Sequence, residues 1–368
     1  MVGIAVEDPV VIGRPPEKKR HVARALRERI VAGQLAPGAR LPSQQQLVHR
    51  FGVSGMTVQS SVRELVREGF VTTRRGKGMF VAATQPHFTN YVLLIPGSAT
   101  IGGVGHSQFW RALRAEAEAI QTAGRIKLTT LTGVDVGETS EAVQRRLATD
   151  VREHRVAGLI FAAFFSRVMD SPLITEPRIP RAAISEHSMP GVGSVYPDLH
   201  SFIDQALDRL AAEGCRRIGM VGLADWGRRA QYFSAGCRRR GLTTAPLWQV
   251  TLAMEQGEGV TRCVELLLRR PAAQRPDGLV ITDDNLVPAV TAGVAAAVSG
   301  AGRRLSIVAH TNLGYPTPSA VPVARLGYSA RELLERCVTV VEQQRRAAAF
   351  PALQLVPARW ATEEGSPA

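Results

Sequence analysis

The chain of 368 residues is too long for one ordinary domain and suits two or three. Its hydrophobic content of 45% and charged content of 21% are typical of a globular protein, and no apolar run approaches the roughly 20 residues of a membrane-spanning helix. The first residues lack the basic start of a signal peptide, so we expect a cytoplasmic protein without a membrane partner. The four cysteines form no C-x-x-C pair, which argues against a zinc site or a disulfide framework and predicts buried thiols.

The net charge of +13 is concentrated near the N-terminus. Residues 1–84 carry 14 Lys and Arg against 6 Asp and Glu, a balance of +8, whereas the other 284 residues carry 31 against 26, a balance of +5. This asymmetry predicts a polyanionic partner for the N-terminal part, with a solvated basic surface as the alternative.

The N-terminal part has the pattern of three short helices. Residues 18–33 place apolar side chains along one helical face, and Gly33 ends this helix. Ser43 is placed to cap the second helix, and Gln46 completes a capping box three residues later. Ser54 caps the third helix, whose apolar positions recur at helical spacing, and Gly69 ends it. These positions are Val58, Val62, Leu65 and Val66.

Two β-prone runs follow and flank the sequence RRGKG at residues 74–78, which predicts a hairpin with a cationic tip. Three helices and a basic hairpin predict a winged helix-turn-helix, in which the third helix enters the major groove of DNA. The predicted organisation is a disordered arm over residues 1–17, the winged helix over residues 18–82 and a linker over residues 83–90.

The stretch LPSQQQLVHRFGVSGMTVQSSVRELVREGFVTTRRGKGMFV resembles the GntR-type winged helix of bacterial transcription regulators. The segments LPS, FGVS, TV and GKG-x-FV occur in the same order. Members of that family often carry an acidic residue after LPS, and arginines in the second helix and at the start of the third. This chain instead has Gln44, Gln45, Gly55 and Gln59. Because arginine prefers guanine and glutamine prefers adenine, we expect the head not to read guanine through arginine; the alternative is a head that has lost sequence-specific binding.

The candidate DNA contacts divide by expected role. Thr57, Gln59 and Ser60 are expected to face base edges, and Gln45 a base or a phosphate. Arginines of the third helix, Arg67 included, and of the hairpin are expected to grip the DNA backbone. The predicted DNA-binding set is Gln45, Ser54, Thr57, Gln59, Ser60, Arg63, Arg74, Arg75, Gly76 and Lys77.

Residues 91–362 alternate between apolar strand candidates and amphipathic helices. The series begins with YVLLIP and FWRALRAEAEAIQTAG and closes with LSIVAHT and SARELLERCVTVVEQQ. Such alternation predicts parallel sheets, and about 270 residues of it suggest two α/β lobes. Ligands of such folds bind beyond the carboxyl ends of the strands.

The stretches YPDLHSFIDQALDRLAAEGCRRIGMVG, RRAQYF and DGLVITDDNLVPAV resemble the periplasmic-binding-protein-like effector domain of LacI-type regulators. The resemblance implies two hinged lobes that close on a small molecule, often a sugar, and a homodimer. The predicted fold class is therefore α/β, an N-terminal winged helix-turn-helix followed by a two-lobed periplasmic-binding-protein-like domain with parallel sheets. The predicted function is a ligand-responsive transcription regulator with a double-stranded DNA operator, and a repressor is favoured over an activator.

The resemblance also implies effector-binding positions. Arg229 matches the arginine of an R-x-x-G-F segment, Asp284 (or Asp283) matches a strand-end aspartate, and His310 or Asn312 lies where relatives often have another. Core packing of the aromatic residues, helix capping by Asp284 and a surface or dimer role for Arg229 stay open as alternatives. The predicted effector-binding set is Phe109, Trp110, Asp198, Trp226, Arg229, Asp284, His310 and Asn312.

Two departures from the family pattern are expected to reshape this pocket. Tyr232 replaces a usual glycine, and TDDN replaces a common Asn-Asp pair. A standard pentose or hexose is therefore not a secure expectation for the ligand.

Motifs of enzymes are missing from the sequence. It contains no G-x-G-x-x-G, no G-x-x-x-x-G-K-[ST], no G-x-S-x-G and no H-E-x-x-H, and its eight histidines show no metal spacing. We predict no catalytic site, no cofactor and no metal. Two alternatives stay open: a small-molecule-binding module with lost specific DNA binding, and an α/β enzyme fused to a DNA-binding head.

Overall fold

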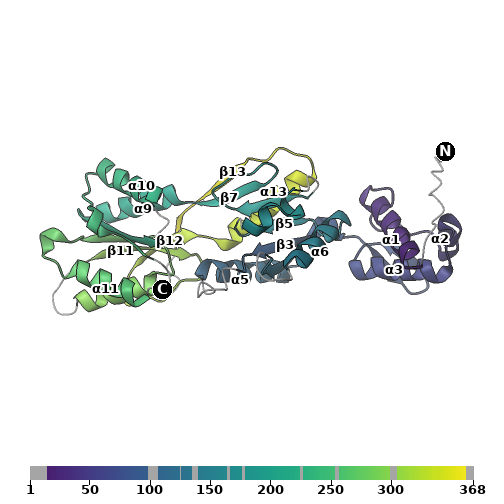
Figure 1. Ribbon diagram of the computed structural model, residues 1–368, viewed down its shortest axis with the longest axis horizontal. Coiled ribbons are helices and arrows are strands. Elements are labelled where there is room, and N and C mark those ends of the chain that lie inside the picture. Colours follow the sequence, from purple (N-terminus) through teal and green to yellow (C-terminus); the bar gives the residue numbers. More distant parts are fainter. Residues whose placement is uncertain are drawn as a thin grey trace, which may run out of the picture.

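The computed structural model describes residues 15–97, 107–124, 126–134, 140–163, 166–175, 179–223, 227–252, 257–298 and 305–361. A small helical head and a two-lobed α/β body lie in a row along the longest axis of the molecule (Figure 1). The first lobe of the body lies between the head and the second lobe.

The head contains three helices and one antiparallel hairpin, and it has a core of its own. Apolar side chains of the helices and the hairpin pack together, with Leu26, Leu47, Phe51 and Phe70 fully buried. The elements of the head are α1 (Pro15–Val31), α2 (Gln44–Phe51), α3 (Gly55–Glu68), β1 (Val71–Arg74) and β2 (Gly78–Val81).

The predicted helix boundaries of the head are confirmed at their caps. Ser43 and Gln46 form the capping box of α2, and the Ser54 hydroxyl accepts a hydrogen bond from the backbone of Thr57 at the start of α3. Gly69 ends α3 in the left-handed conformation. The start of α1 is a correction, because residues 15–17 were expected in a disordered arm and are helical, whereas residues 1–14 lie outside the described residues.

The segment expected to be a linker, residues 83–90, is largely structured. It contains the short helix α4 (Pro86–Thr89), and Asn90 already begins the first strand of the body. Gln85, Pro86 and His87 are buried because the head and the first lobe pack around them. Composition alone did not reveal this burial.

The first lobe has a six-stranded parallel sheet in the order β13-β7-β6-β5-β3-β4. Apolar residues of α5 and α13 cover one face, and those of α6 and α8 cover the other. The strands are β3 (Asn90–Ile95), β4 (Lys127–Thr132), β5 (Gly158–Phe161), β6 (Arg181–Ile184), β7 (Gly193–Asp198) and β13 (Leu353–Pro357). The helices are α5 (Gln108–Thr122), α6 (Ser140–Arg152), α7 (Ser166–Met169), α8 (Pro172–Thr175) and α13 (Ala330–Arg345).

The second lobe repeats this plan with the strand order β14-β12-β11-β10-β8-β9, in which only β14 is antiparallel to its neighbour. Helices α9 and α10 pack on one face and α11 and α12 on the other. The strands are β8 (Ile218–Leu223), β9 (Gln249–Leu252), β10 (Gly278–Ile281), β11 (Ser306–Asn312), β12 (Ala324–Tyr328) and β14 (Arg359–Trp360). The helices are α9 (Leu199–Ala212), α10 (Gly227–Arg239), α11 (Gly257–Leu268) and α12 (Val287–Val298), with short 3₁₀ turns at Pro246–Trp248 and Ala272–Gln274.

The chain passes between the lobes at three points of the described structure: from β7 to α9, from β12 to α13 and from β13 to β14. The predicted two-lobed fold with parallel sheets is therefore confirmed. One cysteine differs from expectation: Cys263 is exposed on α11, whereas Cys215, Cys237 and Cys337 are buried. Among the described residues, no helix has both the length and the apolarity needed to cross a bilayer.

Candidate DNA-binding and effector sites

Helix α3 has a buried apolar face and an exposed polar face. Val58, Val62 and Leu65 are buried in the head, whereas Gln59, Arg63 and Arg67 are exposed. The exposed residues follow each other at a spacing of four and therefore share one face of the helix. This face combines an amide, a group suited to base edges, with guanidinium groups, which are suited to phosphates.

The side chains predicted to contact DNA at the start of α3 differ in whether they are free to do so. The Ser54 hydroxyl lies 2.9 Å from the Thr57 hydroxyl and accepts the Thr57 backbone N–H at 3.2 Å. Both hydroxyls are therefore engaged in the helix cap, and Ser60 is half-buried. Met56 is 78% exposed at the same end, and the sequence analysis missed it. Its apolar side chain suits the methyl group of thymine.

Gln44 and Gly55, which both depart from the GntR pattern, are in contact with each other. The Gln44 side-chain amide donates a hydrogen bond to the Gly55 carbonyl oxygen at 3.0 Å. A Cβ atom at position 55 would lie only 3.0 Å from the same nitrogen of Gln44. The glycine therefore leaves room for the glutamine, and the neighbouring Gln45 stays exposed.

The hairpin tip projects cationic side chains into solvent. Arg74, Arg75 and Lys77 are exposed, and the Arg74 guanidinium lies 4.9 Å from the centre of the Phe80 ring. Gly76 has a φ of 72°, which closes the tip without strain. The tip therefore has the charge and the conformation required to approach a phosphate backbone.

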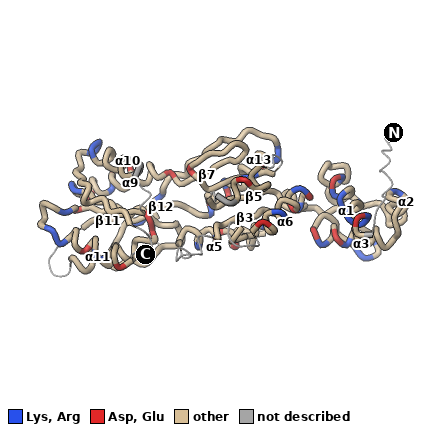
Figure 2. Tube along the Cα trace, viewed as in Figure 1, with Lys and Arg blue, Asp and Glu red and all other residues tan. Residues whose placement is uncertain are grey.

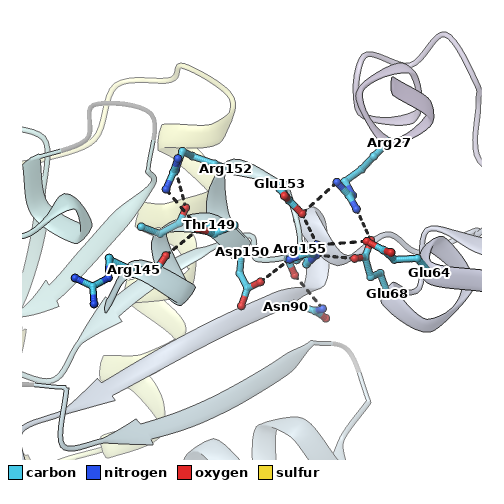
Figure 3. A network of polar contacts seen from close by, with 11 residues as sticks. Arg27, Glu64, Glu68, Asn90, Arg145, Thr149, Asp150, Arg152, Glu153 and Arg155 are labelled. Atoms are coloured by element: carbon cyan, nitrogen blue, oxygen red, sulfur yellow. Dashed lines mark hydrogen bonds and ion pairs between the residues drawn. The ribbon is translucent and has the colours of Figure 1, made fainter. Parts of the chain in front are cut away.

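The acidic residues of α3 face the body and are neutralised there. Arg27 of α1, only 2% exposed, pairs with Glu68 at 2.6 Å and with Glu153 at 3.4 Å, and Arg155 pairs with Glu68 at 2.7 Å (Figure 3). We call this set the head–body network; its members are Arg27, Glu64, Glu68, Asp150, Glu153 and Arg155.

The network leaves the free face of α3 cationic. Burial alone would raise the pKa of the Glu64 carboxyl, but the hydrogen bond and charge of Lys19 and the charge of Arg155 hold that pKa below its ordinary value. Both acids of α3 are therefore paired with cations, Glu64 with Lys19 and Glu68 with Arg27 and Arg155. Lys and Arg occur over both the head and the body (Figure 2), so this sorting around α3, and not charge density alone, marks the candidate DNA face.

In the second lobe, three predicted effector residues lie together at the carboxyl ends of β10 and β11. Asp284 is 2% exposed, and its Oδ2 accepts a hydrogen bond from the Asn312 amide at 2.6 Å. The Nδ1 atom of His310 lies 3.8 Å from Oδ1 of Asp284. Asp283, beside them, accepts hydrogen bonds from the backbone and side chain of Asn285. Such convergent polar groups at strand ends are typical of ligand sites in α/β folds.

The carboxylates of this cluster influence the protonation of His310. Its ring packs against Phe202 and Tyr328, with centroids 5.7 and 5.6 Å away. Burial lowers the pKa of the imidazole, but the nearby negative charges of Asp284 and Asp283 outweigh it and raise the pKa above its ordinary value. Burial in turn raises the pKa of the Asp283 carboxyl.

Polar contacts join the two lobes beside this cluster. The Gln108 backbone N–H at the start of α5 donates to the Asn285 side-chain oxygen at 3.0 Å. On the same helix, Glu116 accepts a hydrogen bond at 3.1 Å from the hydroxyl of Tyr315, which follows β11 of the second lobe. Within the first lobe, Glu116 also pairs with Arg331 of α13 at 2.9 Å. The loops that follow β10 and β11 therefore contact the first lobe.

Comparison with known proteins separates the chain into two matched parts. Residues 18–81 match the model described as bacterial regulatory proteins, gntR family. The head is a gntR-family domain. Residues 207–360 match the periplasmic binding protein-like domain. The resemblances drawn from the sequence are confirmed for both parts.

Curated relatives of the gntR-family head are regulators. The chain is 43% identical to the histidine utilization repressor of Klebsiella aerogenes over 61 residues, which are 17% of this chain and 25% of that protein. It is 34% identical to the mannosyl-D-glycerate transport/metabolism system repressor MngR of Escherichia coli (strain K12) over 74 residues, 20% of this chain and 31% of that one. The matches thus span less than a third of these relatives.

Solved structures match the body in fold. A LacI family transcriptional regulator from Lactobacillus casei with bound sucrose aligns with a TM-score of 0.54 at 15% identity, covering 74% of this chain and 98% of that one. The trehalose repressor from Escherichia coli aligns with a TM-score of 0.50 at 15% identity, covering 74% and 99%.

Of the other predicted effector residues, those that the structure describes lie on α5, β7 and α10 and not at the strand ends that carry the Asp284 cluster. Phe109 and Trp110 are half-buried with their rings 5.0 Å apart, and they pack on the core of the first lobe next to the Gln108 contact. Asp198 caps α9, where one carboxylate oxygen accepts two backbone N–H groups at 3.1 Å. Trp226 lies outside the described residues, and so does the side chain of Arg229, whose backbone is in α10.

Tyr232 is engaged by α9. Its hydroxyl donates to Asp204 at 2.5 Å, and its ring stacks on His200 with centroids 3.9 Å apart. The expectation that Tyr232 reshapes the ligand pocket stays a prediction.

Arg325 was missed by the sequence analysis because β12 was not recognised as a strand. Its Nη2 donates to the Thr317 carbonyl oxygen at 2.6 Å. Its Nη1 is buried with no partner among the described residues. Burial lowers the pKa of this guanidinium although the charge of Asp284 opposes that shift. Because its Nη1 is a buried donor that can still form a hydrogen bond, the guanidinium of Arg325 is a further candidate ligand group beside Asp284.

The raised pKa of His310 predicts how the stability of the second lobe depends on pH. A histidine whose folded pKa exceeds its ordinary 6.5 contributes stability that is complete below pH 6.5 and is lost as the pH rises through the folded value. We expect the difference in unfolding temperature between the native chain and His310→Asn to shrink as the pH rises. Thermal unfolding from about pH 5 to about pH 9 measures it. A difference that stays constant, or an equal trend in His200→Asn, would contradict the assignment.

Proposed function

We propose that the chain is a ligand-responsive, DNA-binding transcription regulator that acts as a homodimer and most simply as a repressor. The observation that carries the proposal is the connection of a gntR-family head, with a cationic and glutamine-bearing face on α3, to a two-lobed periplasmic-binding-protein-like body. Its relatives named as repressors and the sucrose-bound LacI-type structure support it. The ligand class we propose is a sugar or a related polyhydroxylated molecule.

The proposed mechanism is a shift between two arrangements of the lobes. A ligand held by Asp284, His310 and Asn312 favours closure, because the neighbouring Asn285 already contacts the other lobe. The first lobe is joined to α1 and α3 through the head–body network, so lobe movement is transmitted to the recognition helix. In a dimer, the spacing of the two heads then matches the operator half-sites better or worse.

The two kinds of contact on α3 give different expected results. Replacement of Gln59 by Ala should weaken operator binding by about 10- to 100-fold and relax the base preference at one position, since a bidentate base contact contributes about 1–3 kcal/mol. Replacement of Arg63 by Ala should weaken all duplexes alike and lower the salt slope by about one. Fluorescence anisotropy at several salt concentrations separates the two. Uniform losses for both variants would contradict base reading by Gln59.

Two competing functions make different predictions. A binding module without specific DNA recognition predicts equal affinity for operator and scrambled duplexes, and an enzyme predicts turnover of the bound ligand. Thermal unfolding of the full chain against a panel of sugars and polyols tests the effector, because a ligand that binds the native state raises the unfolding temperature by mass action. No rise with any of them would refute the sugar class and leave the DNA-binding proposal standing.

A further inference from the structure

A cavity of about 990 Å³ lies where the head meets the first lobe, and none of its described lining residues belongs to the second lobe. Its wall includes Val31 at the end of α1, His87 and Phe88 of α4, and residues around α6, β5 and the end of α13. The volume is at the upper end of the range of small-molecule sites. The cavity is therefore large enough for an organic ligand in contact with both head and body.

The charged side chains among the described lining residues of the cavity are all arginines. Arg152, Arg345 and Arg346 line it, and no Asp or Glu is among its described lining residues. Glu342, which is not among the lining residues, pairs with Arg346 at 3.8 Å and accepts a hydrogen bond from the Tyr91 hydroxyl at 3.3 Å. Arg345 lies with its guanidinium 4.7 Å from the centre of the Phe88 ring. The wall thus joins guanidinium donors to a flat apolar surface, a combination that suits an anionic group attached to an apolar body.

The side chain of His87 is a second observation that indicates a ligand in this cavity. Its side chain is 7% exposed and lines the cavity, yet neither ring nitrogen has a hydrogen-bond partner among the described residues. The ring is held between Phe70 of the head and His154 of the body, with centroids 6.0 and 6.3 Å away. Buried polar atoms are normally satisfied, and one left without a partner requires an explanation such as a ligand.

We propose that this junction cavity is a second ligand site that binds a small organic anion, with a carboxylate or phosphate group against the arginines and an apolar part against Phe88 and Phe350. Such a ligand contacts the end of α1, the junction helix and the first lobe at once. It would favour one orientation of the head on the body, next to the head–body network (Figure 3). The site is separate from the effector cluster in the second lobe. A second small molecule could therefore influence the same contact between head and body that the effector influences.

The test uses the full chain and three matched probes: benzoate, phenyl phosphate and the neutral benzyl alcohol. Isothermal titration and thermal unfolding should show saturable binding of at least one anion and none of the alcohol. Arg345→Met and Arg152→Met should each weaken that binding about 10-fold or more, the usual loss for a charged hydrogen bond. Arg216→Met, an exposed arginine of the second lobe, should leave it unchanged.

His87→Phe provides an independent variant, because it keeps the ring and removes both nitrogens. It should also weaken anion binding while sugar binding in the second lobe and operator affinity stay intact. Failure of both anions to bind, equal binding of benzyl alcohol, or unchanged affinity in the Arg345, Arg152 and His87 variants would overturn the proposal. None of these outcomes would touch the function proposed for the head and the effector cluster, which is measured with DNA and sugars.

Discussion

Replacement of Arg27 by Met is expected to destabilise the docked head by about 3–5 kcal/mol, the loss typical of a buried ion pair deprived of one partner. Arg27 is 2% exposed and bonds both Glu68, 7% exposed, and Glu153 of the body. Without the guanidinium, the buried Glu68 carboxylate keeps Arg155 as its one cationic partner among the described residues. Urea unfolding followed by circular dichroism, with hydrogen exchange of α1 and α3, measures the effect.

A matched control lies one turn away on the same helix. Arg24 is exposed and pairs only with Glu28 at 3.9 Å, so Arg24→Met should change stability by less than about 0.5 kcal/mol. We also expect Arg27→Met to uncouple the two functions, so that ligand still binds the body but no longer changes the affinity for DNA. Equal stability of the two variants, together with an intact ligand response in Arg27→Met, would contradict the role assigned to the head–body network.

Replacement of Asp284 by Ala is expected to weaken the effector by about 10- to 100-fold, since a hydrogen bond to a charged group contributes about 1.5–3 kcal/mol. The same change leaves the Asn312 amide and the His310 ring beside an empty space, and it should cost a further 1–3 kcal/mol or so of stability. Titration calorimetry with a sugar found in the thermal panel measures the affinity.

Two further variants separate ligand binding from folding. Asp284→Asn keeps the size of the side chain, so it should recover much of the stability but little of the affinity if the charge accepts ligand hydroxyl groups. Asp208→Ala removes an exposed carboxylate of α9 in the same lobe and should leave ligand affinity unchanged. Full affinity in Asp284→Ala would show that the aspartate only holds the loop together.

Local signals in the sequence predicted the head well. The caps at Ser43 and Ser54 and the glycine at position 69 are short-range features, and each works through neighbours within a few residues. The alternation of strands and helices likewise predicted two parallel sheets. The strands β12, β13 and β14 escaped because they are short and lack a clear pattern, and their partners lie in both lobes.

The joint between head and body could not be read from the sequence. Arg27 and Glu68 are 41 residues apart, and Arg27 and Glu153 are 126 apart, so no spacing rule connects them. Arg27 also interrupts the apolar stripe of α1 as an ordinary surface arginine would. The burial of His87 could not be predicted either, because the segment from residue 83 to 90 has the composition of a linker. Asp284, His310 and Asn312 were expected at neighbouring strand ends and lie there, because Asp284 follows β10 and the other two are at the end of β11. Their role in ligand binding stays a prediction.

Selection of duplexes from a random pool by the full chain, followed by anisotropy with the enriched and a scrambled sequence, tests the central claim most directly. We predict a preference of about 1,000-fold or more for the enriched duplex near physiological salt, and a change of that affinity when a sugar effector is added. Equal affinities for the enriched and scrambled duplexes would contradict a sequence-reading regulator.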